Sequence, residues 1–501
     1  MNAFKRKSLY VAVVTGLGTA ASMQAGAVNL GTDNTGEVLI YPYYTVRNGY
    51  VTSLSVVNSS TSETKAVKVR FLEGKNSAEV LDFNLFLSPR DVWTGSVAQD
   101  PAGATLTTTD RSCTSPPIPA AGQAFSNLYY TGGSTAGAGT ADRGGDGLDR
   151  TREGYVEIIE MGVVSLAAVI TAVKHGANGT PANCAVVQAP ALLLNGITIQ
   201  QPTGGLSGNA IIINGTTGTE FAYVPVSLAN FSDTALYTEP GSTSPSLASV
   251  SPATSQVFQS TLAAPSIVTD TWTNPINAVS AVFQHSQVHN EYDVRSGFKT
   301  DWVITMPTKR SYVGVTPALA PFANHFTGAA GLAQSCDPVF VAAYDREEAP
   351  YAVTLGAVFS PAPAGAPAGT GNLCWESTVV TIVPNGGTAV ASSVFASANA
   401  GSITLPANGV GSPVAPNYIA GWISLTPTGA QTGQTVIGSA TGDPVITNVA
   451  SGGISGALGL TSGQRYRGLP MVGFAAINAI ISGQGYGGIF NHKFNTTINT
   501  P

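Results

Sequence analysis

Two histidines stand at a spacing that could hold a metal ion. His285 and His289 lie four residues apart in "HSQVHNEYD", after a run of helical periodicity, so that one helix face could present both imidazoles. Glu291 and Asp293 follow and add two carboxylates, although the HExxH zinc motif is absent. The alternative is a polar helix end, where the same side chains hydrogen-bond to neighbouring loops.

A second group of acids could hold calcium, the one cofactor that the sequence leaves open. Asp142, Asp146 and Asp149 lie in the Gly-rich stretch "DRGGDGLDRTREGYVE", and carboxylate oxygens are ligands that calcium prefers. Their spacing does not match the EF-hand loop. Three arginines occur in the same stretch, so the alternative is a loop held together by ion pairs.

Signatures of catalysis are not found. "GQGYGG" (483–488) matches the dinucleotide pattern GxGxxG, but only thirteen residues follow it, so a glycine turn between two strands is favoured. The chain has no GxSxG or Walker A motif. We therefore expect no enzymatic activity. A hydrolase would require two acids and a histidine to converge in one cleft.

Residues 1–27 have the features of a secretory signal peptide. A basic start at residues 5–7 precedes the apolar run "LYVAVVTGLGTAAS", and "AGA" (25–27) resembles a cleavage site. We expect export to the extracellular space or the cell surface, on the outer face of a Gram-negative envelope, with no transmembrane span in the mature chain.

Four cysteines are consistent with export. They stand at 113, 184, 336 and 374 without a CxxC motif, and disulfides are the default in an oxidising compartment. Proximity along the chain favours Cys113–Cys184 and Cys336–Cys374. Three connectivities are possible, and free buried thiols remain an alternative.

The charge content narrows the range of partners. Charged residues make up 10% of the chain, against about 25% in ordinary globular domains. Without residues 1–27, 19 basic residues face 28 acidic ones, a net charge of −9. Such a chain is a poor binder of nucleic acid. Few charges and many small polar residues are typical of surface, filament and layer proteins, which favours self-association or binding to cell-surface polymers.

The hydrophobic pattern predicts a mainly β fold with one or two short helices. Residues 36–97 contain about five short alternating strands, typical of an immunoglobulin-like sandwich. Asn48-Gly49 predicts a type I′ hairpin between "IYPYYTV" and "YVTSLSVVN". The best helix begins at Asn274-Pro275 and extends through the two histidines.

The predicted sandwich is discontinuous, with long loop insertions, because the region 28–110 has too few strands to complete it. Residues 111–270 form a Gly/Ala/Thr-rich insertion with mixed β structure. Residues 271–501 form a β-rich region that we expect to complete the N-terminal sandwich.

Exposed aromatic side chains could form a carbohydrate-binding surface. In the predicted hairpin most tyrosines face the core, but Tyr44 and Tyr50 remain candidates for contact with a ligand. Trp93, in "VWTGSV", is a third. A carbohydrate-binding module is therefore the first alternative function, and a secreted hydrolase is the second.

Four stretches resemble a group of exported proteobacterial cell-surface proteins. They are "YPYYTVRNGYVTSLSVVN", "TREGYVEIIEMG", "TDWVITMPTKR" and "YGGIFNHK". The resemblance implies export and a surface location, and it carries no catalytic or ligand residues. The sequence as a whole predicts an exported structural or adhesive protein of the cell surface, in a surface layer, a filament or a matrix.

Overall fold

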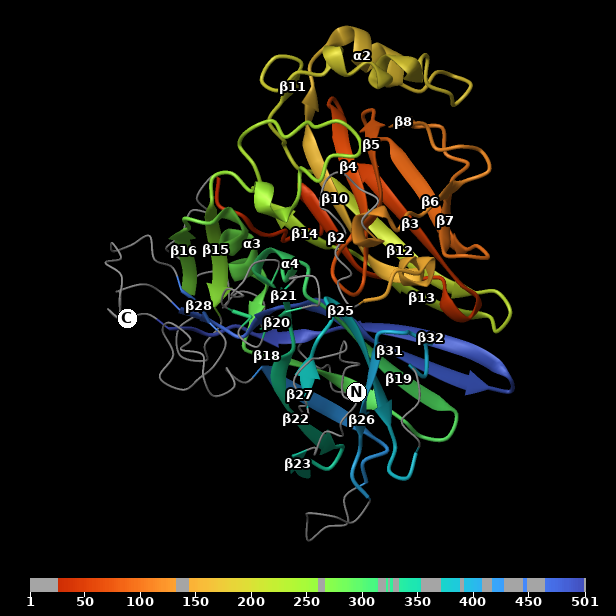
Figure 1. Cartoon of the computed structure of the whole chain (residues 1–501), viewed down its shortest axis with the longest axis vertical. Helices are drawn as coiled ribbons and strands as arrows, with labels where there is room; N and C mark the ends of the chain where they lie inside the picture. The colour runs from red at the N-terminus through yellow and green to blue at the C-terminus, as the bar shows by residue number, and fades with distance from the viewer. Residues whose placement is uncertain are drawn as a thin grey trace, which may run out of the picture.

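Two β-sandwiches make up most of the molecule, and Figure 1 shows one above the other. The structure is a computed structural model. It describes residues 26–131, 144–259, 266–313, 321–322, 325–327, 333–352, 371–387, 392–407, 417–427, 445–447 and 465–499. Most of the predicted signal peptide lies outside the described residues. The mainly β fold is as predicted, and no described helix is long and apolar enough to span a membrane.

The N-terminal sandwich consists of two sheets. The larger has the order β1-β14-β2-β10-β4-β5-β8, with β11 beside β10. Its strands are β1 (Asn29–Leu30), β2 (Val38–Thr45), β4 (Thr64–Glu73), β5 (Glu79–Leu87), β8 (Cys113–Ser115), β10 (Glu153–Val164), β11 (Ile199–Gln200) and β14 (Val226–Ala229). The second has the order β13-β12-β3-β6-β7-β9. Its strands are β3 (Tyr50–Asn58), β6 (Val92–Gln99), β7 (Ala104–Thr107), β9 (Gln123–Ala124), β12 (Leu206–Asn214) and β13 (Thr219–Tyr223).

Alternating sequence patterns account for this sandwich. Val67, Val69 and Phe71 of β4 lie in the core, as the period of two predicts. Lys68 and Arg70 point to the opposite face of the sheet, yet they are buried as well. Later segments of the chain cover this outer face, so the large sheet is enclosed on both sides.

The predicted hairpin at Asn48-Gly49 is wrong. Both residues have the positive φ angles, 53° and 76°, that the sequence predicts. However, β2 pairs with β10 and β14, whereas β3 pairs with β6 and β12. The turn therefore carries the chain from one sheet to the other. Apolar side chains of β2 and β3 meet across the sandwich core instead of side by side within one sheet.

Strands β10 and β12–β14, from residues 153–229, complete the N-terminal sheets. The sequence pattern predicts these partner strands within residues 271–501. That region instead forms sheets of its own, because each of its long strands finds an antiparallel neighbour within the same region.

The C-terminal sandwich also has two main sheets. One has the order β23-β22-β27-β18-β33, with β24 beside β22, and the other has the order β26-β25-β19-β31-β32. The strands are β18 (Gln287–Asp293), β19 (Phe298–Thr305), β22 (Asp337–Asp345), β23 (Pro350–Ala352), β24 (Asn372–Leu373), β25 (Ser377–Val383), β26 (Ala400–Thr404), β27 (Ala420–Pro427), β31 (Val472–Ile481), β32 (Gln484–Asn491) and β33 (Lys493–Asn495).

Small sheets and short helices fill the space around the sandwiches. The strand pairs are β15 (Thr254–Gln259) with β16 (Ser266–Thr271), β17 (Gln284–His285) with β30 (Leu469–Pro470), and β20 (His325–Thr327) with β21 (Ala333–Ser335); β29 (Arg465–Arg467) lies between β28 (Val445–Thr447) and β34 (Ile498–Asn499). The α-helices are α1 (Leu128–Thr131), α2 (Ala167–Val173), α3 (Pro275–Phe283) and α4 (Arg310–Val313). Helix α3 begins as predicted, with Asn274 at its N-cap.

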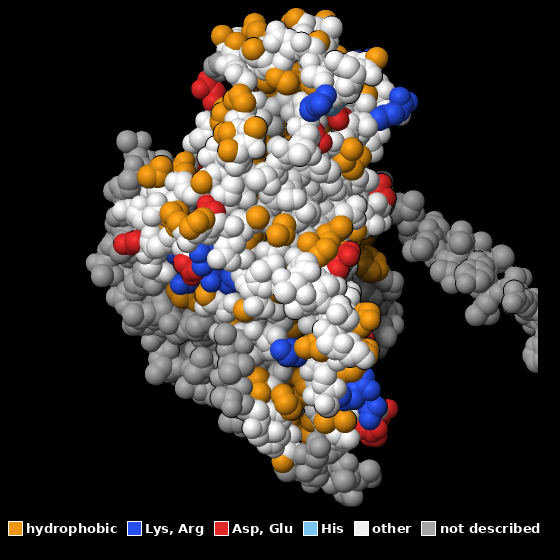
Figure 2. Space-filling model, turned by 90° about the vertical axis from the view of Figure 1, so that its right-hand side faces the viewer, with side chains coloured by type: hydrophobic (Ala, Val, Ile, Leu, Met, Phe, Trp, Pro, Cys, Tyr) orange, Lys and Arg blue, Asp and Glu red, His pale blue; other side chains and the backbone are white. Residues whose placement is uncertain are grey.

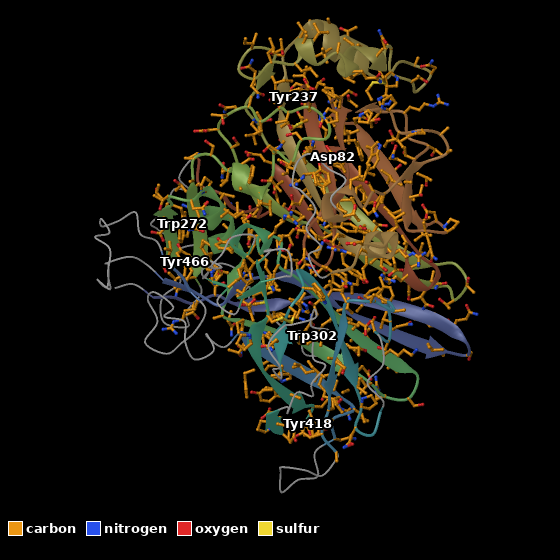
Figure 3. All side chains as sticks on the ribbon, in the orientation of Figure 1. Asp82, Tyr237, Trp272, Trp302, Tyr418 and Tyr466 are labelled. Carbon is orange, nitrogen blue, oxygen red and sulfur yellow. A yellow bond between two sulfur atoms is a disulfide. The ribbon has the colours of Figure 1, made fainter. Side chains whose placement is uncertain are left out.

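The two sandwiches share a continuous core. The ring of Phe395 lies 5.4 Å from that of Tyr43 and 5.8 Å from that of Tyr50. Remote segments also meet beside α3, where the rings of Trp272 and Tyr466 are 5.3 Å apart (Figure 3). We therefore treat the chain as one packed body when considering its surface.

Candidate interaction surface

The histidine pair does not form the predicted site. Helix α3 ends at Phe283, so His285 lies in β17 and His289 in β18 instead of on one helix face. His285 is buried, its ring stacks on Phe494 at 4.0 Å, and its Nδ1 lies 3.2 Å from the Thr496 hydroxyl. Burial lowers the pKa of His285 to about 3, so the ring is neutral. Within the described ranges, no three His, Cys, Asp or Glu side chains group to hold a metal.

One of the three acids predicted to bind calcium is held by arginines. Asp142 lies outside the described residues, and Asp146 is exposed. Asp149 accepts from Arg47 at 2.8 Å and from Arg152 at 2.9 Å. The hydrogen bond from Arg47 lowers the pKa of Asp149. Its carboxylate therefore binds arginines, which is the alternative that the sequence left open.

The three aromatic candidates are buried and cannot contact an external ligand. Tyr44 is 0% exposed, Tyr50 3% and Trp93 0%. The Tyr44 hydroxyl donates to the Thr151 carbonyl at 3.0 Å. The reason is the sheet-to-sheet corner at residues 47–49, which turns both strands into the core. This finding corrects the expectation of an aromatic binding surface.

Both favoured disulfides are present. Cys113–Cys184 attaches the segment around α2 to β8, and Cys336–Cys374 joins the beginnings of two strand regions in the C-terminal sandwich. Gly483 lies in the turn between β31 and β32, and the rest of the glycine pattern, residues 484–488, belongs to β32 itself. Gly485 and Gly487 face β13 of the other sandwich and allow close approach there.

Much of the small set of charged residues is withdrawn from the surface. Lys65 pairs with Glu160 at 2.7 Å, and Lys68 pairs with Asp82 at 2.5 Å. Arg70 lies beside them on β4 and bridges two buried glutamates. The pairs of Lys68 and Arg70 occupy the outer face of the large sheet, beneath later segments of the chain, whereas Lys65 and Glu160 lie on the side of their strands that faces the sandwich core. Figure 2 shows charged side chains on one face in small groups separated by wide uncharged areas.

The outer face of the N-terminal sheet β13-β12-β3-β6-β7-β9 is different because most of its side chains remain accessible. Its strands alternate strictly between buried and accessible residues. The accessible side chains are small, hydroxylated or aliphatic: Val51, Ser53, Ser55, Val57, Val92, Thr94, Ser96, Ala98, Thr105, Thr107, Ser207, Asn209, Ile211, Ile213, Glu220 and Ala222. Glu220, on the edge strand β13, is the one ionisable residue among them. We call this surface the hydroxyl face.

A shallow groove of about 410 Å³ crosses the hydroxyl face between β3, β6 and β7. Several of its hydroxyls already have internal partners. Ser53 and Ser96 hydrogen-bond to each other at 2.7 Å, and Thr108 donates to the Thr94 carbonyl at 2.6 Å. These bonds hold the hydroxyls in fixed positions, so the groove is a preformed neutral surface with remaining acceptor capacity.

A second cavity contains acids. It has a volume of about 360 Å³ and lies between the large sheet, α3 and α4. Glu79 and Glu157 line it, and both accept hydrogen bonds from Arg70, at 2.6 and 2.8 Å. Burial raises the pKa of Glu157 to about 7, although Arg70 acts in the opposite direction. Two acids thus converge here, but no histidine is among the residues that line this cavity.

Comparisons of the chain with protein-family models, with curated proteins and with solved structures found no match. The function must therefore be inferred from the residues described above. The hydroxyl face is an accessible feature among them that internal contacts do not explain.

Proposed function

We propose that the protein is an exported structural or adhesive component of the cell surface, such as part of a layer, filament or matrix, without catalytic activity. In this proposal copies of the chain associate through the hydroxyl face. The observation that carries the proposal is that this face is accessible and nearly free of charge, while several charged residues elsewhere are paired in the interior. Low charge on both partners removes the repulsion that would oppose their association.

The size of the hydroxyl face supports this role. Five strands spaced about 4.8 Å apart, with lengths up to about 30 Å, cover about 600 Å². A stable protein interface buries about 800 Å² on each partner, so this face with its rim is of the required size. Aliphatic side chains such as Ile211 and Ile213 would supply hydrophobic contact, and the serines and threonines would supply hydrogen bonds.

The location is part of the same proposal. Two disulfides fit an oxidising compartment outside the cytoplasm. The predicted signal peptide leads to export, and we place the mature chain on the outer face of a Gram-negative envelope. Fractionation of the native cells tests this point, since the protein is expected in surface or extracellular material of high mass. Recovery as a periplasmic monomer alone would contradict the proposal.

A substitution at the centre of the hydroxyl face tests the association. Thr94→Lys places a charge in the middle of the interface, so that copies would repel or bury an unpaired ammonium. We expect association, measured by sedimentation or light scattering, to weaken about tenfold or more. Thr404→Lys is the matched control, because Thr404 is also an exposed threonine, but on the edge strand β26 of the other sandwich. Equal effects of the two substitutions would contradict the assigned surface.

The groove favours carbohydrate binding as a second candidate. Its neutral hydroxyl and amide groups, including Asn209, match the hydrogen-bonding groups of an uncharged glycan. The aromatic residues expected to stack on a sugar are buried, so the groove alone supports this candidate. A glycan array with the wild-type protein and Thr94→Lys tests it. Binding that this substitution abolishes would favour a glycan over a second copy of the chain.

A further inference from the structure

Lys309 is a buried lysine in the C-terminal sandwich. It follows β19 and precedes α4, and 1% of its side chain is accessible. Its Nζ lies 5.4 Å from the centre of the Phe322 ring. Burial lowers the pKa of Lys309, because a charged ammonium loses its hydration in this environment. The neutral, nucleophilic form of the amine is therefore more populated here than at a surface lysine.

Three groups surround Nζ of Lys309. The carbonyl oxygens of Leu373 and Cys374 lie at 3.2 and 3.1 Å, and Oδ2 of Asp337 lies at 3.4 Å. A neutral amine has two hydrogens and one lone pair. When it donates both hydrogens to the two carbonyls, its lone pair is left for the Asp337 carboxyl group. This arrangement brings a nucleophile and a carboxyl carbon together in a dry interior.

Glu376 is a third buried ionisable group at this place. Neither of its carboxyl oxygens has a hydrogen-bond partner among the described residues. Burial raises the pKa of Glu376 well above its usual range, which favours the protonated acid. Its charged neighbours are Arg310 and Lys309, with Glu73 and Glu157 acting in the opposite direction. An unpaired buried acid is costly to keep, which points to a chemical use for its proton.

Covalent and backbone links hold the three segments in place. The disulfide Cys336–Cys374 joins the residue before Asp337 to a residue two positions before Glu376. Asp337 lies opposite Leu373 in the pairing of β22 with β24. The Met306 amide, three residues before Lys309, donates to the Glu376 carbonyl at 2.7 Å. The three side chains are therefore positioned by contacts other than their own.

We propose that Lys309 and Asp337 are joined by an intramolecular isopeptide bond, with Glu376 as the proton carrier. The Lys309 amine attacks Cγ of the protonated Asp337 carboxyl group and forms a C–N bond. A proton passes from nitrogen through Glu376 to the departing hydroxyl, the C–O bond breaks, and one water molecule leaves. Glu376 regains its proton and no group is oxidised or reduced. The amide replaces a buried amine and acid by a neutral group.

Two other buried lysines, Lys65 and Lys68, also pair with acids, but their surroundings favour an ion pair over an isopeptide bond. Glu160, the partner of Lys65, accepts hydrogen bonds from the Thr203 and Gly204 amides at 3.1 and 2.9 Å. Burial raises the pKa of Glu160, but these amide donors and Lys65 favour its carboxylate form, which is a poor electrophile. Asp82, the partner of Lys68, likewise accepts from the Gly241 amide at 2.8 Å. Among the described residues, neither pair is in contact with an acid whose carboxyl oxygens are both unpaired.

The bond would connect the two sheets of the C-terminal sandwich. Lys309 follows the end of β19, which belongs to the sheet β26-β25-β19-β31-β32 of the C-terminal sandwich. Asp337 is the first residue of β22, which belongs to the other sheet of that sandwich. A covalent link at this point would prevent the sheets from separating under force or protease attack. This property suits a protein exposed outside the cell, but the bond does not depend on how copies of the chain associate.

Mass spectrometry of the exported full-length protein tests the proposal. After reduction and alkylation, and with the N-terminus determined on the same sample, the intact mass should be one water molecule below the sequence mass. Fragment spectra should show a branched peptide in which residue 309 is attached to residue 337. An intact mass equal to the sequence mass, with residues 309 and 337 in separate linear peptides, would overturn the proposal.

Variants assign the roles. Lys309→Arg removes the nucleophile, and Glu376→Gln removes the proton carrier, so both should show the full sequence mass. Lys493→Arg, at an exposed lysine, is the control and should keep the mass deficit. Circular dichroism on each variant establishes that it folds, and the wild-type mass decides the question if Lys309→Arg does not. Retention of the deficit in folded Glu376→Gln would overturn the role of Glu376.

Discussion

Lys65 and Glu160 form an ion pair inside the molecule, with 2.7 Å between Nζ and Oε1 and neither side chain accessible to solvent. Nζ also donates to the Thr203 hydroxyl at 2.6 Å. Both charges are thus fully engaged, one with a hydroxyl and the other with backbone amides. In a chain with so few charged residues, this pair fixes segments that are far apart in the sequence.

Breaking this pair should destabilise the protein strongly. Lys65→Met leaves the Glu160 carboxylate buried without its counter-ion, which typically costs about 3–5 kcal/mol. We expect a loss of that size in the free energy of unfolding, measured with urea. Lys493→Met is the control, since Lys493 and Glu291 form an exposed pair at 3.5 Å and its loss should cost less than about 1 kcal/mol. Similar losses for both would contradict the buried pair.

The Glu37 carboxyl group should make stability depend on pH. Burial first, and then the charge of Glu160, raises the pKa of Glu37 to about 7, although the Phe231 and Ser232 amides and Lys65 favour its charged form. Between about pH 4.5 and 7 the folded state holds a proton that the unfolded chain has released. Stability should therefore fall as the pH rises through this range and level off above it, by up to about 3 kcal/mol.

Glu37→Gln tests the source of this dependence. Glutamine has the shape of the protonated acid but does not titrate, so the variant should show a smaller fall in stability between pH 4.5 and 7. Urea unfolding at several pH values measures the difference. An unchanged slope would assign the pH dependence to other buried acids, such as Glu157, whose pKa is also raised to about 7.

The strands could be predicted from the sequence, but their partners could not. The alternation in β4 and β5 correctly assigned Val67, Val69 and Phe83 to the core. Asn48-Gly49 has the predicted backbone angles, yet the same turn geometry serves a hairpin within one sheet and a corner between two sheets. The choice depends on β10 and β12, more than 100 residues later, which pair with β2 and β3. Local patterns contain no information about such partners.

The candidate interaction surface could be predicted from the sequence only in part, for a related reason. Serines and threonines alternate with core residues in β3 and β6, so the sequence contained the signal for a hydroxyl face. The sequence predicts a ligand contact at Trp93. In the structure Trp93 is instead the core residue between the exposed Val92 and Thr94. Lys309, Asp337 and Glu376 share no local motif. The neighbouring Cys336 and Cys374 are the one sequence feature that could have linked the latter two.

The disulfide Cys113–Cys184 should stabilise the region around α2 more than the rest of the molecule. It joins residues 71 positions apart and attaches this region to β8 at the sheet edge. Replacing both cysteines with serine should cost about 2–5 kcal/mol. We expect limited proteolysis to cut first within residues 165–200 of the variant, while the fragments that contain β2 and β10 stay intact. First cuts elsewhere would contradict this assignment.

Gly487 should be essential for the contact between the two sandwiches. A Cβ at this position would lie 2.2 Å from the Glu220 carbonyl oxygen on β13, and backbone cannot move away easily. The neighbouring Gly485 amide donates to the Thr217 carbonyl at 3.1 Å, so the two edge strands already touch. Gly487→Ala should therefore force β32 and β13 apart and lower the free energy of unfolding by about 1–3 kcal/mol. Gly215→Ala, where a Cβ meets nothing within 4 Å, should change stability by less than about 0.5 kcal/mol. If Gly487→Ala were as stable as this control, the glycines of β32 would not be needed for this contact, and other links, such as the shared core around Phe395, would hold the sandwiches together.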